Sequence, residues 1–298
     1  MFAILISTKN RKTELLFTLK KIDALLQRED VECVVFDDGS DDGTFDAVKQ
    51  NFPQVKLQRN EISRGYMYCR NKLLNEATAA FAISLDDDAH FLSADPLEQI
   101  QSHFESHPQC GLTAFRLWWS RNDSADFNTH EKTTPVKGFV GCGHAWRIEA
   151  WRGIRNYPEW FQFYGEEDFA SMELFKQGYT VDYLPKVLVQ HRVDLKARSK
   201  TQKDFGFRYR RSFRAGWYLY FLFYPASKIP RKLLYTLFIQ VKKIFKGNFN
   251  VIAPLFLSVF DVLKNLPRLR KSRRALTIAE YNRYVQLNET KIFWNPEK

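Results

Sequence analysis

Three adjacent aspartates, Asp86, Asp87 and Asp88, directly follow the apolar segment 81–85, which is typical of a buried strand. Adjacent carboxylates repel one another unless a cation lies between them. Side chains alternate along an extended chain, so Asp86 and Asp88 can face the same way. Carboxylate oxygens suit Mg²⁺ or Mn²⁺, and either ion can also hold a diphosphate. The aspartates are therefore a candidate metal site, and a solvated acidic turn is the alternative.

A second acidic segment, residues 37–44, follows the apolar run 32–36 and reads Asp-Asp-Gly-Ser-Asp-Asp-Gly-Thr. Asp37 and Asp38 could accept hydrogen bonds from the hydroxyls of a ribose or from an N–H group of a base. Gly39 permits a tight backbone turn after them. The alternative is a turn followed by an Asp or Ser N-cap, in which Asp37 is wholly structural.

Alternating strand-like and helix-like segments surround these motifs. Apolar runs predict strands at 2–6, 32–36, 55–57 and 81–85, and helical spacing predicts helices at 15–26, 45–52 and 66–79. This alternation is typical of βαβ units and a parallel sheet, so the predicted fold class is α/β. Ligands of such sheets bind beyond the carboxyl ends of the strands. We therefore expect the polar segments 7–10, 37–40 and 86–88 to converge.

The pattern continues less regularly to residue 191. It predicts strands at 111–119, 136–143, 180–183 and 187–191, and a helix at 166–176 that Gly178 ends as a C-cap. Beyond residue 192 the chain becomes basic and aromatic. This change predicts two parts, with a domain at 1–195 and a helical region at 196–298.

The charge of the chain is unevenly distributed between these parts. The net charge is +11, but residues 196–298 hold 23 Lys and Arg against 5 Asp and Glu, a net of +18, whereas residues 1–195 carry −7. A basic segment of this kind is expected to meet an anionic surface, for which phospholipid and nucleic acid are the candidates.

The basic part also carries apolar helix faces. Apolar residues recur at helical spacing within 233–241, and Trp217 and Tyr218 belong to an aromatic run. No apolar run reaches the roughly 20 residues of a membrane span. We therefore expect amphipathic helices that lie on a membrane through Trp217 and Tyr218, with the cations of 268–274 toward acidic lipid. The alternative is a helical subdomain that packs its apolar face on the sheet.

Cysteine usage bears on the compartment. The four cysteines are scattered and form no CxxC pair. This spacing argues against a zinc ribbon and a disulfide framework, and it favours reduced thiols in a cytoplasmic protein. The first apolar stretch is too short for the core of a secretory signal.

Taken in order, the motifs resemble those of family 2 glycosyltransferases with the GT-A fold. The resemblance covers about residues 1–195 and is carried by the segments 6–11, 35–40, 64–65, 70–71, 85–88, 141–143, 166–168 and 178–179. It implies a Rossmann-like nucleotide-binding domain with a mostly parallel sheet and flanking helices. It also implies sugar transfer from a nucleoside diphosphate donor to an acceptor hydroxyl, with inversion and a divalent metal.

The resemblance assigns roles to residues by position. It implies that Thr8 and Asp38 contact the nucleoside and that Arg64 and Arg70 lie near the donor. The full set implied to bind the nucleotide sugar is Thr8, Asn10, Arg11, Asp37, Asp38, Arg64, Arg70, Asp86 and Asp87. The ion, Mn²⁺ or Mg²⁺, is implied to bind Asp86, Asp88 and His191.

The resemblance also places the general base in the acidic triplet Glu166, Glu167 and Asp168. In the family the base is the aspartate of a Glu-Asp pair, about eleven residues before a glycine. Counting back from Gly178 selects Glu167, whereas the literal Glu-Asp pair selects Asp168, and Glu166 is the third candidate. The alternative is that the triplet only complements the dipole of the helix 166–176.

Together these expectations predict a glycosyltransferase that takes part in the synthesis of a surface glycan or polysaccharide. It would act at the inner face of the cytoplasmic membrane on a glycan or lipid-linked acceptor. A nucleotidyltransferase is one alternative, but the glycine-rich, lysine-containing phosphate motif expected early in such a chain is missing. A protein that binds nucleic acid or another anionic surface through its basic part is a second. The acidic first 195 residues and the lack of a recognition motif argue against nucleic acid.

Overall fold

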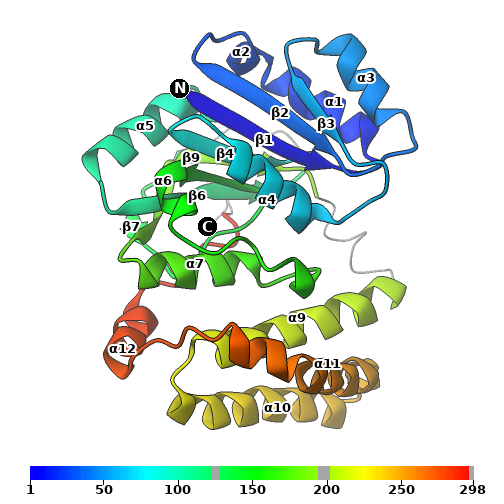
Figure 1. Ribbon diagram of the computed structural model, residues 1–298, viewed down its shortest axis with the longest axis vertical. Helices are drawn as coiled ribbons and strands as arrows, with labels where there is room; N and C mark the ends of the chain where they lie inside the picture. Colours follow the sequence, from blue (N-terminus) through cyan, green and yellow to red (C-terminus); the bar gives the residue numbers. More distant parts are fainter. Residues whose placement is uncertain (122–127, 194–201, 295–298) are drawn as a thin grey trace.

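The computed structural model describes residues 1–121, 128–193 and 202–294. A mixed sheet with helices on both faces forms its upper part in Figure 1, and a group of helices lies below. These lower helices are α9 (Gln202–Phe223), α10 (Ile229–Phe245), α11 (Ile252–Lys271) and α12 (Ile278–Gln286). The junction predicted after residue 195 lies outside the described residues.

Four strands form the parallel half of the sheet: β1 (Phe2–Thr8), β2 (Val31–Asp37), β3 (Lys56–Arg59) and β4 (Phe81–Asp86). Their order is β3-β2-β1-β4, and Ile4 of β1 is in register with Cys33 of β2 and Ile83 of β4. Side chains of β1 alternate between two apolar cores, with Ile4 in one and Leu5 in the other. Burial on both faces explains why this strand is a continuous apolar run.

The sheet continues through strands that mix both directions: β8 (Gly143–Arg147), β6 (Cys110–Trp119), β9 (Thr180–His191), β5 (Ala89–Phe91) and β7 (Thr134–Pro135). Strand β8 is antiparallel to β4 and β6, whereas β6 and β9 are parallel. Strands β5 and β7 pair antiparallel with β9. The architecture confirms the predicted α/β class.

The strand predicted at 136–143 is a loop, and β8 begins where it was expected to end. No continuous strand ladder forms here, and side chains as well as single strand residues pair with the backbone groups of this loop. The N–H of Gly141 donates to Glu167, the carbonyl of Gly141 accepts from Arg70, and the carbonyl of Cys142 accepts from the N–H of Asp86.

Two further differences concern β9 and an additional helix. The strands predicted at 180–183 and 187–191 are one strand, because the register of β9 against β6 shifts next to Pro185 and so accommodates that residue. Helix α5 (Pro96–Ser106) is absent from the sequence-based prediction. It begins with proline in its first turn and buries Leu97, Ile100 and Phe104.

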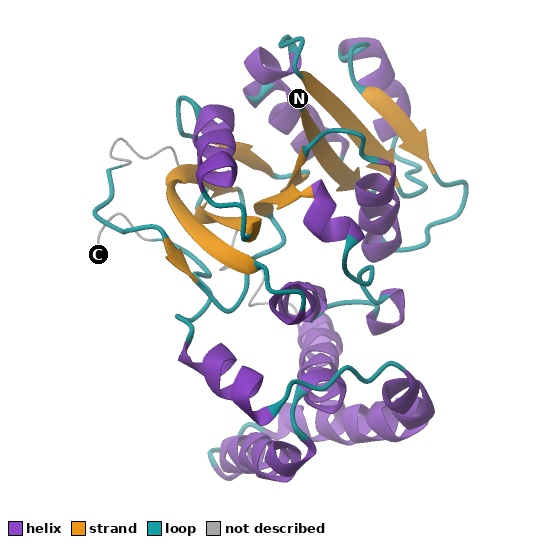
Figure 2. Ribbon diagram, turned by 60° about the vertical axis from the view of Figure 1, so that its left-hand side comes forward, coloured by secondary structure: helices purple, strands orange, loops and turns teal. Residues whose placement is uncertain are grey.

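Helices cover both faces of the sheet. One face carries α1 (Lys12–Lys21), α2 (Asp23–Leu26), α3 (Thr44–Asn51) and α5, and the other carries α4 (Tyr66–Glu76), α6 (Ile148–Arg152) and α7 (Glu166–Lys176). Short 3-10 turns lie at η1 (Glu159–Phe161), η2 (Ala226–Lys228) and η3 (Phe249–Val251). Figure 2 shows α7 between the sheet and the lower helices.

The lower helices share a core with the sheet. Phe223 of α9 packs on Phe169 of α7, with ring centroids 5.3 Å apart. Glu173 of α7 is fully buried and pairs with Arg155 at 2.6 Å and Arg274 at 2.9 Å. The alternative considered for the basic part, a helical subdomain packed on the sheet domain, therefore describes α9.

The residues predicted to meet a membrane differ from those that are exposed. Trp217 and Tyr218 are 4% and 1% exposed, because Trp217 lies toward α10, where it donates to Thr236, and Tyr218 lies toward η1 and α11. Part of the basic cluster 268–274 is also internal: Arg273 donates to the carbonyls of Phe221 and Tyr224. Most of the exposed apolar residues of the basic part lie instead on α10 and α11.

One helical segment among the described residues, Phe249–Lys271, is long and apolar enough to cross a membrane when only length and composition are counted. The prediction that no such segment exists is wrong in this sense. That prediction was based on unbroken apolar runs, whereas the mean hydropathy of a window can stay high despite isolated charged residues such as Asp261. A third of the most apolar window is buried inside the protein, and Asp261 pairs with Arg210 of α9.

Candidate active site

A cavity of about 620 Å³ lies at the carboxyl ends of β1, β2 and β4. The structure thus brings together the three polar segments that end these strands. Many of the predicted functional residues line the cavity: Thr8, Arg11, Asp38, Arg70, Asp86, Asp87, Asp88, Glu166, Glu167 and His191.

Asp87 is tied into the wall of this cavity. Its carboxylate accepts from Thr8 Oγ1 at 2.8 Å and from Arg11 Nε at 2.7 Å. Burial raises the pKa of Asp87 to about 7, although Arg11 opposes this effect. Arg11 also donates to Asp88 at 2.5 Å. One arginine therefore offsets much of the repulsion within the aspartate cluster.

Asp86, Asp88 and His191 form a candidate metal site. Each offers a ligand atom, and these atoms lie within 4.8 Å of one another. Pairing of β5 with β9 places Ala89 opposite His191 and so carries the imidazole to the end of β4. His191 Nε2 lies 3.1 Å from Asp88 Oδ1 and 3.9 Å from Asp86 Oδ2.

The donor set fits a divalent ion. Carboxylate oxygens suit Mg²⁺ and Mn²⁺, and the imidazole nitrogen favours the transition metal of the two. Burial raises the pKa of Asp88, but His191 and then Arg11 outweigh it and lower this pKa to about 2, so the carboxylate is ionised. The side chains of Asp88 and His191 are 7% exposed and that of Asp86 is 33% exposed. The site therefore opens on the side of Asp86.

Arg70 connects this site to the acidic triplet. It is buried, and one guanidinium nitrogen donates to Asp86 Oδ1 at 2.5 Å and to the carbonyl of Gly141 at 3.0 Å. Glu167 Oε1 accepts from the N–H of Gly141 at 3.2 Å. A Cβ atom at position 141 would lie 2.7 Å from Arg70 and 2.9 Å from Glu167, so a larger residue here would displace these two side chains.

Helix α7 turns the three acidic side chains in different directions. Glu166 accepts from the hydroxyl of Tyr66 at 2.6 Å. Burial, and then the charge of Glu166, raise the pKa of Glu167 well above its ordinary value. Asp168 is not among the described residues that line the cavity, and its Oδ1 lies toward Gly138.

Asp38 organises the loop that follows β3. Its two carboxylate oxygens accept hydrogen bonds from Asn60, Ser63 and the backbone N–H groups of Arg64 and Gly65, all at 2.7 to 2.8 Å. Burial raises the pKa of Asp38, but these four bonds outweigh it and hold the pKa below its usual value. Gly39 has a φ of +73°, and a Cβ atom there would crowd this loop at 3.2 Å.

Three predicted donor-binding residues are not among the described residues that line the cavity. The side-chain oxygen of Asn10 accepts a backbone N–H of the second acidic segment. Asp37 is fully buried and accepts from the N–H of Ser40 at 2.9 Å. The guanidinium of Arg64 lies over the ring of Tyr68, 3.5 Å from its centroid. All three side chains make contacts within the loops or helices that surround the cavity.

Further side chains that line the cavity carry no motif by which the sequence could have identified them: Tyr66, Phe163, Tyr164 and Arg208. Arg208 belongs to α9, so the helical part closes the cavity that was predicted for the first domain alone. Gln162 and Tyr164 have φ angles of +66° and +67°, which non-glycine residues seldom adopt. No sequence pattern signals such a backbone.

The sequence and fold of the chain match known proteins. The family described as glycosyl transferase family 2 matches residues 3–151. No curated protein matches the chain by sequence.

Several solved structures have a similar fold. TarS of S. aureus is 15% identical with a TM-score of 0.53, over 71% of this chain and 40% of that one. The mannosyltransferase PcManGT from Pyrobaculum calidifontis, in complex with GDP-Man and Mn²⁺, is 20% identical with a TM-score of 0.53, over 70% and 61%. GalNAc-T7 with UDP, GalNAc and Mn²⁺ is 14% identical with a TM-score of 0.59, over 76% and 49%.

At these identities the likeness establishes the fold, and it confirms the predicted GT-A architecture. The chain spans less than two thirds of the length of each of these three proteins.

Proposed function

The chain belongs to glycosyl transferase family 2, and we propose that it transfers a sugar from a nucleoside diphosphate donor to an acceptor hydroxyl. One observation carries this proposal: a single cavity holds both the candidate metal ligands and the half-buried carboxylate of Glu167. A metal ion held by these ligands could bind the diphosphate of a donor, and the carboxylate of Glu167 could accept a proton. Similar solved structures contain GDP-Man, UDP or UDP-GlcNAc, which supports a donor of this class.

Asp86, Asp88 and His191 would hold the metal ion. We favour Mn²⁺ over Mg²⁺ because one donor is an imidazole nitrogen, and Mn²⁺ in two of the similar structures supports this choice. A bound ion supplies positive charge that stabilises the departing nucleoside diphosphate. Arg11 and Arg70 hold the aspartates in place through the bonds described above.

Glu167 accepts the proton of the acceptor hydroxyl in this proposal. Its raised pKa makes it a stronger base than an ordinary carboxylate, and the N–H of Gly141 orients it. Asp168 lies outside the cavity, which favours the choice of Glu167 made by counting from Gly178. Attack from the face opposite the leaving group inverts the anomeric carbon in a single displacement.

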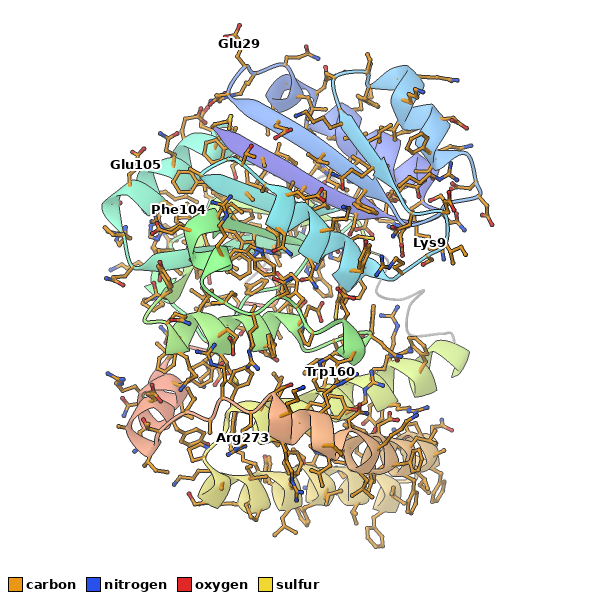
Figure 3. All side chains as sticks on the ribbon, in the orientation of Figure 1. Lys9, Glu29, Phe104, Glu105, Trp160 and Arg273 are labelled. Atoms are coloured by element: carbon orange, nitrogen blue, oxygen red, sulfur yellow. The ribbon has the colours of Figure 1, made fainter. Side chains whose placement is uncertain are left out.

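We further propose that the enzyme acts at the inner face of the cytoplasmic membrane, on a glycan or lipid-linked acceptor of surface polysaccharide synthesis. Exposed apolar stripes support this: Leu234, Phe238, Val241 and Phe245 on α10 are 67, 63, 41 and 87% exposed, and Phe256, Phe260 and Leu263 on α11 are 71, 61 and 63% exposed. Side chains of both helices project away from the sheet in Figure 3.

The charge around these stripes favours an anionic bilayer as the surface that covers them. Lys242 and Lys246 lie beside the stripe of α10, within a region of net charge +18. Apolar faces flanked by cations are typical of helices that lie in the plane of an acidic membrane. The pairing of Asp261 with Arg210 holds α11 against α9, which supports attachment at the surface over a span.

Isothermal titration calorimetry with UDP- and GDP-sugars tests the donor site. The wild-type protein should bind one of them in Mn²⁺ and lose at least about tenfold in affinity in EDTA. Asp88→Asn should weaken binding in Mn²⁺ to a similar degree. The matched control is Asp46→Asn, on the exposed face of α3, which should bind as the wild type does. Equal affinities in Mn²⁺ and EDTA would contradict the proposal.

A further inference from the structure

A second cavity, of about 550 Å³, lies between η1, α9 and α11. Arg210 and Arg214 from α9, Lys264 and Arg268 from α11, and Trp160 from η1 line it. A smaller cavity of about 260 Å³ shares Arg210, Arg214 and Gln162 with it and adds Arg211. The two cavities together form a basic pocket that the proposed chemistry leaves without a role.

The positive charge of the basic pocket exceeds what the protein itself neutralises. Five cations line it, and Asp261 is the one acidic side chain among its described lining residues. Arg210 holds both oxygens of Asp261, at 2.8 and 2.6 Å, and Arg214 approaches the same carboxylate at 3.5 Å. One carboxylate therefore serves two arginines, and the other three cations of the pocket have no carboxylate partner in the part of the chain that the structure describes.

Arg214 is the most deeply placed of these cations. It is 6% exposed, one of its nitrogens donates to the carbonyl of Phe161, and its Nε has no partner among the described residues. Arg211 contributes two further nitrogens that are buried without a described partner. Burial, then Arg214 and Arg210, lower the pKa of Arg211. A bound anion would stabilise buried cations of this kind, because it would accept charge-assisted hydrogen bonds from their unpaired N–H groups.

The place of the basic pocket in the molecule points to its ligand. Gln162 lines both of its cavities, and the next two residues along the chain, Phe163 and Tyr164, line the candidate active site. On the other side, Leu257 lines the smaller cavity and is 45% exposed on α11 among the apolar residues of that helix. The pocket thus lies between the cavity for sugar transfer and the face proposed to meet lipid.

We propose that the basic pocket binds the phosphate or diphosphate group of a lipid-linked acceptor, an inference that rests on the proposed function. Several arginines with unused N–H groups match the oxygens of a phosphate, and Arg268 beside Trp160 adds a cation at the rim. The lipid chain would extend over α11, and the acceptor sugar would reach past Gln162 toward Glu167. The same chemistry would also accept a phospholipid headgroup, which the experiment separates.

Calorimetry with inorganic diphosphate in EDTA tests the pocket without a metal ion in the donor site. Lys264→Gln combined with Arg268→Gln removes two exposed cations of the pocket and should weaken binding by about tenfold or more. Lys242→Gln combined with Lys246→Gln makes the same charge change on exposed positions of α10 and should stay within about twofold of the wild type. Arg211→Gln gives a second pocket variant, should the first prove unstable.

Vesicle flotation then distinguishes the sources of the phosphate. With phosphatidylcholine vesicles that carry a polyprenyl diphosphate, the pocket variant should lose more binding than the α10 variant. With phosphatidylglycerol in place of that lipid, the two variants should lose binding equally. A greater loss by the pocket variant on phosphatidylglycerol as well would assign the pocket to headgroups and overturn the acceptor role. Equal behaviour of the two variants on every probe, or no binding of inorganic diphosphate by the wild type, would overturn the inference altogether.

The two proposals fail separately. The difference between the pocket and α10 variants in diphosphate binding in EDTA reports on the basic pocket, whereas nucleotide-sugar binding in Mn²⁺ reports on the donor site. If the protein binds diphosphate but no nucleotide sugar, the role of the basic pocket is supported and the proposed function is contradicted.

Discussion

At the scale of single residues, the chemistry depends on contacts that span the chain. Asp86 and Asp88 could be selected from the sequence because they follow a strand-like segment, and His191 was implied by the family resemblance. Their approach within 4.8 Å requires the pairing of β5 with β9, and the β5 strand is too short for a pattern to predict. The choice between Glu167 and Asp168 likewise depends on how α7 turns toward the cavity. Sequence patterns locate this helix but not its rotation.

Gly141→Ala tests the close approach around that glycine. The added Cβ atom would lie 2.7 Å from Arg70 and 2.9 Å from Glu167, so both side chains must move. Displacement of a reacting group by about 1 Å can lower turnover by about 100-fold, which we expect in a steady-state assay. Gly216→Ala on α9 meets nothing within 4 Å and serves as the control. Equal turnover in both variants would contradict this placement.

The pH dependence of turnover tests the environment of Glu167. A base with a raised pKa loses its ionised form as the pH falls through that pKa, so the acid limb of kcat should lie above the usual range of a glutamate. Glu166→Gln removes the neighbouring charge and should lower the pKa of Glu167. The acid limb should then move to lower pH. A limb that stays in place in a kcat–pH profile would exclude Glu166 as a cause of the shift.

At the scale of elements, helical periodicity predicted amphipathic helices in the basic part but assigned their faces incorrectly. Trp217 and Tyr218 were predicted to contact lipid, yet both are buried: Trp217 packs against α10, and Tyr218 packs against η1 and α11. Which face of a helix is buried depends on its neighbours, and α9 has neighbours on several sides. The stripes left exposed on α10 and α11 became visible only once α9 and η1 were placed.

Phe245→Gln combined with Phe256→Gln tests those stripes. These side chains are 87% and 71% exposed, so their loss should spare the fold and remove apolar contact with a bilayer. Flotation with anionic vesicles should fall strongly for this variant, and high salt should weaken wild-type binding without abolishing it. Ile62→Gln combined with Ile278→Gln, at exposed positions away from α10 and α11, should float as the wild type does. Equal flotation of both variants would contradict the membrane face.

At the scale of the whole molecule, the two parts predicted on either side of residue 195 share a hydrophobic core. Periodicity and charge separate the two parts because they describe local composition, whereas the buried Glu173 joins them through Arg155 and Arg274. Arg208 of α9 also lines the candidate active site. Contacts over such distances in sequence leave no local pattern.

Glu173→Gln tests this shared core. The change leaves two arginines without their buried partner, and because each is about a third exposed we expect a loss of about 1–3 kcal/mol in the free energy of unfolding. Denaturant unfolding should remain a single transition, since sheet and helices unfold together. Glu98→Gln removes an exposed ion pair with Arg28 and should change stability by less than about 0.5 kcal/mol. Two separate transitions in the wild type would contradict a common core.

The most direct test of the proposed chemistry compares turnover and donor binding in Glu167→Gln and Asp168→Asn. Both substitutions replace a carboxylate by an amide at neighbouring positions of α7, but only Glu167 lines the cavity among the described residues. Glu167→Gln should lower kcat by about 10²- to 10⁴-fold while the Kd for the nucleotide sugar in Mn²⁺ stays near the wild-type value. Asp168→Asn should keep its turnover. Full turnover in Glu167→Gln, or its loss in Asp168→Asn alone, would contradict the assignment of Glu167 as the base.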